Sequence, residues 1–258
     1  MPEILEVEFY RRSAETVVGR PITAVHAPDR WFCKGGTTPE ELKTVLPGAR
    51  ALELGRRGKL LLLHLDIGRT LGLRFGMTGR LIVDGQASVD ELEYSPRRSD
   101  PAWDRFGLDF EGAMLRVSDP RRLGGVQLDP PVERLGPDAL AISRTELAKA
   151  LQASAPLKAK LLDQTAVAGM GNLLVDETLW RAGLDPARPA RSLTPDEVAT
   201  LHKTMRQTLK TLLRRGGSHT GDLQDQRHRG GLCPRDGTPL SRRQVGGRTT
   251  YSCPRHQH

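Results

Sequence analysis

Three features are scarce or missing in this chain of 258 residues, and each narrows what the protein can be. It has only 3 cysteines and no signal-peptide pattern, which argues against a disulfide-stapled secreted domain and predicts a reducing cytoplasmic setting. No apolar run approaches the ~20 residues that a helix needs to cross a bilayer, so no membrane partner is expected. Aromatic residues make up 4% of the chain, so its core must consist mainly of Leu, Val and Ala.

Acidic residues are scarce in one region, the C-terminal fifth. From Leu201 to His258 there are 12 Lys and Arg against 3 Asp and Glu, a net charge of +9, while the whole chain carries +8. The remaining residues therefore carry −1, the difference between +8 and +9. The excess predicts a polyanionic partner that contacts the C-terminal end, and a solvated basic tail is the alternative.

The first half of the sequence has the pattern of a sheet domain. Residues 4–18 carry apolar side chains at helical spacing and predict a helix that starts just after Pro2-Glu3. Residues 88–104 are expected to form an exposed loop. Strands are predicted at Lys59 to Leu65, Thr70 to Arg74, Arg80 to Val83, Gly107 to Phe110 and Ala113 to Val117. These segments together predict a β-sandwich with a leading helix.

The second half follows a Pro-rich linker and is helical. Two capping boxes, at Ser143 and Thr194, open helices, and the second of these helices is long, amphipathic and ends at Gly216. Between them, Leu161 to Trp180 predicts a helix, a tight Gly-rich turn and another helix, an arrangement that often binds DNA. The backbone amides at the start of the helix after Asn172 are expected to be able to hold a phosphate.

The N-terminal residues Pro2 and Glu3 offer chemistry of their own. Once Met1 is removed, Pro2 becomes a secondary amine that is less basic than a lysine side chain. Such an amine can attack a sugar aldehyde and form a Schiff base. The alternative is that Pro2 is simply a common second residue.

Two short motifs near the C terminus have the spacing of metal knuckles. They are Cys233-Pro-Arg-Asp236 and Cys253-Pro-Arg-His256. All four residue types can bind zinc, although aspartate is uncommon in closed structural sites. A metal-free finger held by its hairpin and a Cys233–Cys253 disulfide are the alternatives, the disulfide being disfavoured by a reducing compartment. Cys33 is expected to be a small buried apolar residue.

Short fragments that occur in a fixed order connect these observations. They are Met1-Pro2-Glu3 with Glu6-Val7-Glu8, Arg57-Gly58-Lys59-Leu60, Gly76-Met77-Thr78-Gly79, Asp119-Pro120-Arg121-Arg122, Ala168-Gly169-Met170-Gly171-Asn172 and the terminal knuckles. With them the chain resembles, over nearly its whole length, the formamidopyrimidine-DNA glycosylase / endonuclease VIII (Fpg/Nei, MutM) family. The resemblance implies an α+β fold: a β-sandwich with a leading helix over residues 1–126, a linker over 127–143, a helix–two-turn–helix domain over 144–217 and a zinc-finger-like β-hairpin over 218–258.

The resemblance also implies an activity, that of a bifunctional DNA glycosylase and AP lyase of base excision repair. The Pro2 amine would displace the damaged base, and β,δ-elimination would then cut the backbone on both sides. Glu3 would act as the general acid, and Lys59 would contact the phosphate beside the lesion. The implied partner is damaged double-stranded DNA, met in the cytoplasm at the nucleoid, and the implied state is a monomer.

The resemblance implies DNA-binding roles for further residues. Met77 and Arg121 would fill the hole that a flipped nucleotide leaves, and Leu123 stands where Fpg-type members carry an aromatic wedge. Asn172 and Arg248 match the phosphate clamp of the family, and Lys158 matches a further phosphate-contacting lysine. A helix N-cap is the alternative role for Asn172. Zinc would be held by Cys233, Asp236, Cys253 and His256.

The sequence departs from the family pattern at several places and leaves the preferred lesion open. Leu5 replaces a usual proline, and the 15 residues between Gly217 and Cys233 are too few and too polar for the lid that covers an oxidised purine in Fpg-type members. Abasic sites, ring-opened purines, oxidised pyrimidines or bulkier adducts are therefore favoured over 8-oxoguanine. Two alternatives remain, a non-catalytic lesion-binding protein and a glycosylase specialised for bulky alkyl adducts or crosslinks.

Overall fold

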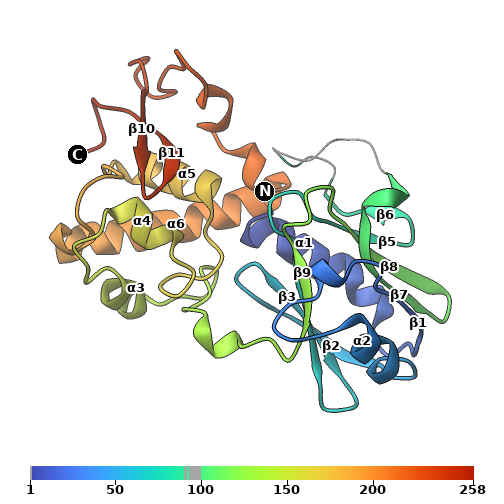
Figure 1. Cartoon of the computed structure of the whole chain (residues 1–258). Helices are drawn as coiled ribbons and strands as arrows, with labels where there is room; N and C mark the ends of the chain where they lie inside the picture. Colours follow the sequence, from blue (N-terminus) through green and yellow to red (C-terminus); the bar gives the residue numbers. More distant parts are fainter. Residues whose placement is uncertain (1, 90–91, 93–99) are drawn as a thin grey trace. The chain divides into compact units, whose positions relative to one another are not determined.

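The computed structural model describes residues 2–89, 92 and 100–258, and they fall into two compact units (Figure 1). The first unit holds residues 2 and 6–132. The second holds residues 3–5 and 133–258, so it takes in three residues from the N-terminal end of the chain.

The first unit is built from two antiparallel sheets and a leading helix. Its elements are α1 (Ile4–Ala14), α2 (Pro39–Val45), β1 (Ile22–His26), β2 (Ala51–Arg57), β3 (Leu60–Leu65), β4 (Thr70–Arg74), β5 (Arg80–Val83), β6 (Gln86–Ala87), β7 (Asp104–Phe110), β8 (Ala113–Ser118) and β9 (Gly125–Leu128). One sheet has the order β1-β7-β8-β5-β6 and the other β2-β3-β4-β9. Side chains from both sheets are buried in one core, among them Leu61, Leu63, Leu108 and Val117. The predicted β-sandwich is therefore confirmed.

The predicted boundaries in this unit hold with small shifts. β4 and β5 have the predicted bounds, and a turn with Gly112 at φ +70° joins β7 to β8. β3 begins at Leu60, so Lys59 lies in the turn before it and not in the strand. The exposed loop predicted over residues 88–104 falls largely on 90, 91 and 93–99, which lie outside the described residues. Val89 and Leu92 are buried, so the prediction is wrong for them.

The second unit is helical and ends in a β-hairpin. Its elements are α3 (Arg144–Ala150), α4 (Leu157–Leu162), α5 (Asn172–Ala182), α6 (Pro195–Arg215), β10 (Ser241–Val245) and β11 (Arg248–Ser252). Both predicted capping boxes are present, and Gly216 ends α6 in a left-handed conformation at φ +109°. The apolar core of the helices also includes Ile4 and Leu5, which is why the first turn of α1 is counted with this unit.

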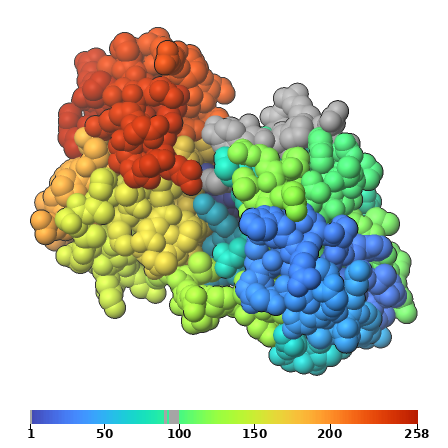
Figure 2. Space-filling model, viewed as in Figure 1, coloured from blue at the N-terminus to red at the C-terminus, as the bar shows by residue number. Residues whose placement is uncertain are grey.

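The helix–turn–helix and the C-terminal hairpin are therefore both present, which confirms the predicted fold class. β11 packs on α5 within the second unit (Figure 1). The space-filling view shows the residues after α6 as one continuous orange and red surface (Figure 2). Among the described residues no helix is both long and apolar enough to cross a membrane.

Candidate active site and nucleic-acid interface

Glu3 is held at the first turn of α5. Its side chain is fully buried, and its two carboxylate oxygens accept hydrogen bonds from the backbone N–H groups of Leu173 at 2.9 Å and Leu174 at 3.3 Å. The Ile4 N–H donates to the Gly169 carbonyl at 3.1 Å, which fixes the backbone beside Glu3. A carboxylate at a helix N-terminus satisfies amides that lack partners within the helix and lies at the positive end of the helix dipole.

This contact changes two predictions made from the sequence. The amides at the start of α5 were expected to be able to hold a phosphate, but those of Leu173 and Leu174 already bind Glu3. The N-cap of α5 is Gly171, and the cap makes no side-chain hydrogen bond, so Asn172 is not the cap. A Cβ on Gly171 would lie 2.2 Å from Cδ of Glu3, so only glycine leaves room for the carboxylate.

Pro2 and Lys59 belong to the first unit. Pro2 is buried and is separated from the start of α1 by Glu3. Lys59 is half-buried in the two-residue turn between β2 and β3, where Arg57 pairs with Leu60. Gly58 precedes it with φ +58°, as a tight hairpin turn with glycine at its first central position requires. The hairpin, rather than a flexible loop, therefore sets the position of the Lys59 amine.

Two loops of the first unit are joined through the buried carboxylate of Asp119. It accepts hydrogen bonds from the Thr78 hydroxyl at 2.5 Å, from the Arg121 N–H at 3.2 Å and from the Gly124 N–H at 2.8 Å. A Cβ on Gly76, whose φ is +57°, would lie 2.5 Å from the carbonyl carbon of Leu123. The two turns thus pack backbone to backbone.

This junction brings the predicted hole-filling residues into one place. Met77 stands beside Thr78 in one turn, and Arg121 and Leu123 flank the other. Arg121 is exposed, and Leu123 is 51% exposed although it is large and apolar. An exposed apolar side chain on a rigid turn is suited to enter a base step.

Asn172 and the hairpin are connected by hydrogen bonds. The Asn172 amide donates to the Thr249 carbonyl at 3.2 Å, while its own carbonyl oxygen is buried without a hydrogen-bond partner. Arg248, the residue before Thr249, is exposed at the start of β11. The tip of the hairpin is packed closely against α4, because a Cβ on Gly246 would lie 2.8 Å from that of Ala159. Asn172 and Arg248 are therefore held close in one arrangement.

Lys158 is fully buried, in contrast to the exposure expected of a free phosphate contact. Its ammonium group donates to Asp176 at 2.6 Å and to the Thr249 carbonyl at 3.1 Å. The second oxygen of Asp176 accepts from Arg227 at 3.1 Å and from the Tyr251 N–H at 3.4 Å. Burial lowers the pKa of Lys158, and the charge of Asp176 opposes that shift. The lysine thus fastens the hairpin to α5 in this structure.

The segment between α6 and the first knuckle is pinned to α5 by neighbouring acidic residues. Glu177 accepts hydrogen bonds from the N–H groups of Asp222 at 3.0 Å and Leu223 at 2.9 Å, and Leu223 is fully buried. Asp176 holds Arg227 further along the same segment. The segment is short, as predicted, and it is also fixed in place.

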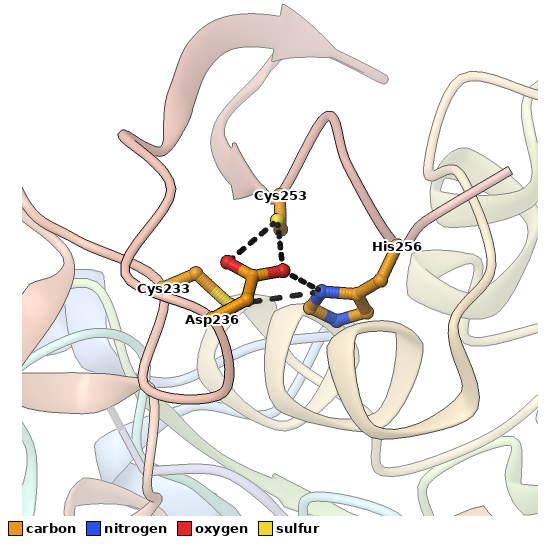
Figure 3. A group of neighbouring side chains, drawn as sticks. All are labelled: Cys233, Asp236, Cys253 and His256. Carbon is orange, nitrogen blue, oxygen red and sulfur yellow. Dashed lines mark hydrogen bonds and ion pairs between the residues drawn. The ribbon is translucent and has the colours of Figure 1, made fainter.

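The knuckle residues Cys233, Asp236, Cys253 and His256 converge (Figure 3). Their ligand atoms all lie within 4.8 Å of one another. Cys253 Sγ is 3.4 Å from Asp236 Oδ2, Cys233 Sγ is 3.6 Å from His256 Nδ1, and that nitrogen is 3.2 Å from Asp236 Oδ2. Zinc bonds of about 2.0–2.3 Å place tetrahedral ligands about 3.3–3.8 Å apart, so these three spacings are close to those around a zinc ion.

Groups around the knuckles hold these ligands in orientation. His256 Nε2 lies 3.3 Å from the Trp180 carbonyl, so a proton on that nitrogen leaves Nδ1 free to coordinate. The Trp180 indole N–H donates to Cys233 Sγ at 3.3 Å. The Thr238 N–H donates to Asp236 Oδ1 at 2.9 Å and lowers the pKa of Asp236. Burial raises the pKa of Cys253, and a bound cation would offset that cost.

All three cysteines are free thiols, and Cys33 is only half-buried.

Comparison with known proteins assigns the chain to a family. The profile of the formamidopyrimidine-DNA glycosylase N-terminal domain matches residues 1–126, and that of the formamidopyrimidine-DNA glycosylase H2TH domain matches residues 135–224. A formamidopyrimidine-DNA glycosylase of Paracoccus denitrificans is 36% identical, covering 98% of this chain and 99% of its own. One from Thermus thermophilus is 37% identical, with 98% and 97% covered. The chain belongs to the formamidopyrimidine-DNA glycosylase family.

Solved structures of the family agree with this assignment. The Lactococcus lactis Fpg in complex with DNA that contains an abasic site superposes with a TM-score of 0.82 at 27% identity, covering 99% of each chain. The complex of the same enzyme with DNA that contains N7-benzyl-Fapy-dG gives 0.83 at 27% identity, covering 100% of each chain. The two family profiles do not reach the knuckles, so the metal group depends on its own geometry.

Some organising residues of this family member were missed by sequence reasoning. Asp119 belongs to one of the ordered motifs, but its role of joining two loops depends on Thr78, 41 residues away. Asp176 and Glu177 looked like ordinary helix acids, and nothing local signals that both are buried.

We predict that replacing Asp176 by serine destabilises the protein by about 3–5 kcal/mol, because two buried cations, Lys158 and Arg227, then lose the carboxylate that both contact. The loss should shrink as the pH rises from 7 toward about 10, because without Asp176 nothing from that carboxylate opposes burial, and the pKa of Lys158 falls further below its unfolded value than in the wild type. Between the two pKa values the native state binds fewer protons, so stability rises with pH. Urea unfolding at several pH values measures this.

Lys160→Met is the matched control for that experiment. Lys160 lies on α4, the same helix as Lys158, and pairs with Asp163 at 2.7 Å, but both side chains are partly exposed. Its loss should cost less than about 1 kcal/mol. An Asp176→Ser protein as stable as the Lys160→Met protein would contradict the predicted fastening role of Lys158.

Proposed function

We propose that this chain is a bifunctional DNA glycosylase and AP lyase of base excision repair that uses the amine of Pro2. The observation that carries the proposal is the fixed carboxylate of Glu3, buried against two amides of α5 and adjacent in sequence to the Pro2 nitrogen. A carboxylate held so firmly next to a candidate nucleophile supports a catalytic role rather than a surface charge. Family membership supports the same reaction.

In this proposal each catalytic residue has one step. The Pro2 amine attacks the anomeric carbon of the damaged nucleotide, and the base leaves with its bonding electrons. Glu3 supplies the proton that assists opening of the sugar ring. The resulting iminium draws electrons from the neighbouring carbon, so successive β- and δ-eliminations release both phosphates. Lys59, on its hairpin turn, holds the phosphate beside the lesion.

DNA binding in the proposal uses both units. Met77, Arg121 and Leu123 fill the space of the flipped nucleotide, supported by the rigid junction at Asp119. Asn172 and Arg248 contact phosphates, because the Asn172 amide has a second N–H besides the one on the Thr249 carbonyl and can donate it to a phosphate oxygen. Lys158 contributes to this clamp by fixing the Thr249 carbonyl that Asn172 also contacts. A DNA substrate would place the protein in the cytoplasm at the nucleoid.

Structural zinc is the cofactor that the knuckles would hold. Two thiolates, one carboxylate and Zn²⁺ give a net charge of −1, the same as for a Cys3His site, so the aspartate does not upset the charge balance. The ion would cross-link the base of the hairpin, next to a small apolar cluster that consists, among the described residues, of Trp180, Leu223, Cys233 and Cys253 with Leu240 packed against it.

The pinned segment after α6 supports a second candidate, excision of bulky adducts. Glu177 and Asp176 bind this segment to α5, so it is not free to fold over a flipped oxidised purine. An uncovered base tolerates extra volume. We therefore expect abasic sites and ring-opened or bulky alkylated purines to be processed faster than 8-oxoguanine.

Borohydride trapping tests the proposed function. Protein with a native, Met-free N-terminus would be incubated with duplexes that carry an abasic site, 8-oxoguanine, a ring-opened purine, a bulky N7-alkyl ring-opened purine or an oxidised pyrimidine. A covalent protein–DNA band establishes the Schiff base, and its dependence on the duplex ranks the lesions. If no duplex gives a band, the abasic one included, the chain is a lesion-binding protein without lyase chemistry.

A further inference from the structure

Trp31 is an exposed indole held beside the Leu123 loop. It lies in a 3-10 turn, Arg30–Phe32, and is 67% exposed, the largest exposed fraction among the large apolar side chains described. Large aromatic side chains are normally buried, so an indole fixed in solvent needs an explanation. Its neighbours in the first unit supply one.

Asp29 ties the Trp31 turn to the loop that carries Arg121 and Leu123. One oxygen of Asp29 accepts the Trp31 N–H at 3.1 Å, and both oxygens accept a bidentate pair of bonds from Arg122 at 2.7 Å each. The hydrogen bonds from Arg122 lower the pKa of Asp29, so the pair is ionised across the ordinary pH range. Arg122 has a left-handed φ of +56°, which this pair helps to hold.

The two segments also pack through their backbones. A Cβ on Gly124 would lie 3.0 Å from the Phe32 ring, and the Lys34 N–H donates to the Val126 carbonyl at 2.8 Å. Phe32 is fully buried in the apolar core of the first unit, and its packing there holds the turn in place. These contacts join the backbones of the Trp31 turn and the Leu123 loop, so neither segment has to be ordered when a partner binds.

The charge around the indole suits a nucleic acid. The Lys34 ammonium group lies 4.7 Å from the centre of the Trp31 ring and donates to the Trp31 carbonyl at 2.6 Å. Arg30 and Arg121 are exposed on the same two segments, while the one acid that joins these segments, Asp29, is neutralised by Arg122. An aromatic face among cations is the pattern that binds unstacked bases beside phosphates.

We propose that Trp31 stacks on a base of damaged duplex DNA that the Leu123 loop has unstacked. Leucine can wedge between neighbouring bases but has no ring with which to cover the exposed base face. The neighbouring indole provides that face, and Lys34 contacts the adjacent phosphate. The inference rests on the proposed function, because only a duplex opened at a lesion presents an unstacked base to this surface.

The test compares Trp31→Ala, Trp31→Phe and Leu52→Ala in the full-length protein. Dissociation constants would be measured for a duplex with a tetrahydrofuran abasic analogue and for the intact duplex. Stacking contributes about 1–3 kcal/mol per base, so Trp31→Ala should weaken lesion binding about five- to a hundredfold. Trp31→Phe should stay within about threefold because it keeps a ring. Leu52, on β2 and 64% exposed, is an equally exposed apolar control and should cause no change.

Base fluorescence and the comparison of lesion with intact duplexes show whether Trp31 stacks on an unstacked base. An orphan 2-aminopurine opposite the lesion should be quenched by the wild type and the Trp31→Phe protein and brighter with Trp31→Ala. Equal weakening on lesion and intact duplexes, or no weakening at all, would overturn the stacking role. Thermal unfolding of each variant checks that the turn is intact, and Trp31→Phe supplies the ring if alanine disturbs it. Wild-type borohydride trapping is scored separately, so failure of the inference and failure of the proposed function remain distinguishable.

Discussion

Replacing Pro2 by glycine or Glu3 by glutamine will abolish base excision while leaving lesion binding largely intact. Pro2→Gly removes the secondary amine and the ring that fixes its direction at the start of α1. Glu3→Gln removes the proton donor, a loss of about 10²–10⁴-fold in rate for a general acid. Single-turnover excision from a ring-opened purine duplex, with dissociation constants measured in parallel, separates chemistry from binding.

Glu3→Gln has a structural effect that the experiment must separate from the chemical one. One carboxylate oxygen becomes an NH2 group facing the Leu173 or Leu174 amide, so one hydrogen bond is replaced by two opposed donors. That costs about 1–3 kcal/mol, which thermal unfolding will show. Glu15→Gln is the matched control, since Glu15 follows α1 directly and is half exposed in a pair with Arg11. Full excision by the Glu3→Gln protein would remove Glu3 from the mechanism.

Gly171→Ala offers an independent test of the position of Glu3 without altering its chemistry. Gly171 has an ordinary backbone conformation, with φ −126°, so alanine causes no backbone strain. Its Cβ would instead lie 2.2 Å from the Glu3 carboxyl carbon, and the flexible end of Glu3 would have to move. The fold should therefore survive while excision falls with Glu3 still present.

Most of the fold was predictable because its signals are local. Short apolar segments placed β4 and β5 at their observed bounds, and the capping boxes at Ser143 and Thr194 depend on residues only three positions apart. Lys59 was misplaced by one residue because Gly58 and Lys59 form the hairpin turn and the paired strand begins only at Leu60. Errors of this kind amount to a residue or so, because turn residues and the first apolar residues of a strand are neighbours at the end of an element.

The contacts that organise the site could not be predicted, since they join distant residues. Lys158 looks like a free cation in sequence, yet Asp176, 18 positions away, and Thr249, 91 positions away, enclose it. The amides of α5 looked available for a phosphate until Glu3, 170 positions earlier, was found on them. The sequence identified which chemistry is present, and the tertiary contacts decide which of these groups remain free to meet DNA.

Removing the metal from the knuckles should unfold the hairpin and weaken DNA binding severely, with the first unit unaffected. The described core of the hairpin region is small, and an isolated two-stranded hairpin is marginal in water. Structural zinc contributes about 10 kcal/mol or more in comparable small fingers. Chelation should shift the emission of Trp180, whose indole N–H contacts Cys233 Sγ, and should displace Thr249 from Asn172 and Lys158. Elemental analysis, tryptophan fluorescence and binding to abasic duplexes measure these effects.

Because the ligand set mixes thiolates with a carboxylate and an imidazole, replacing one ligand should change the zinc affinity in a direction that can be stated in advance. Asp236→Cys should hold zinc more tightly against a competing chelator, because thiolates bind zinc better than carboxylates do. Asp236→Ala and His256→Ala should each lose the metal and the DNA affinity that depends on the Arg248 hairpin. Asp225→Ala, an exposed acid in the preceding segment, serves as the control. Protein free of metal whose Cys233 and Cys253 thiols both titrate, with DNA binding unchanged in the Asp236 and His256 variants, would instead establish a finger held by its hairpin alone.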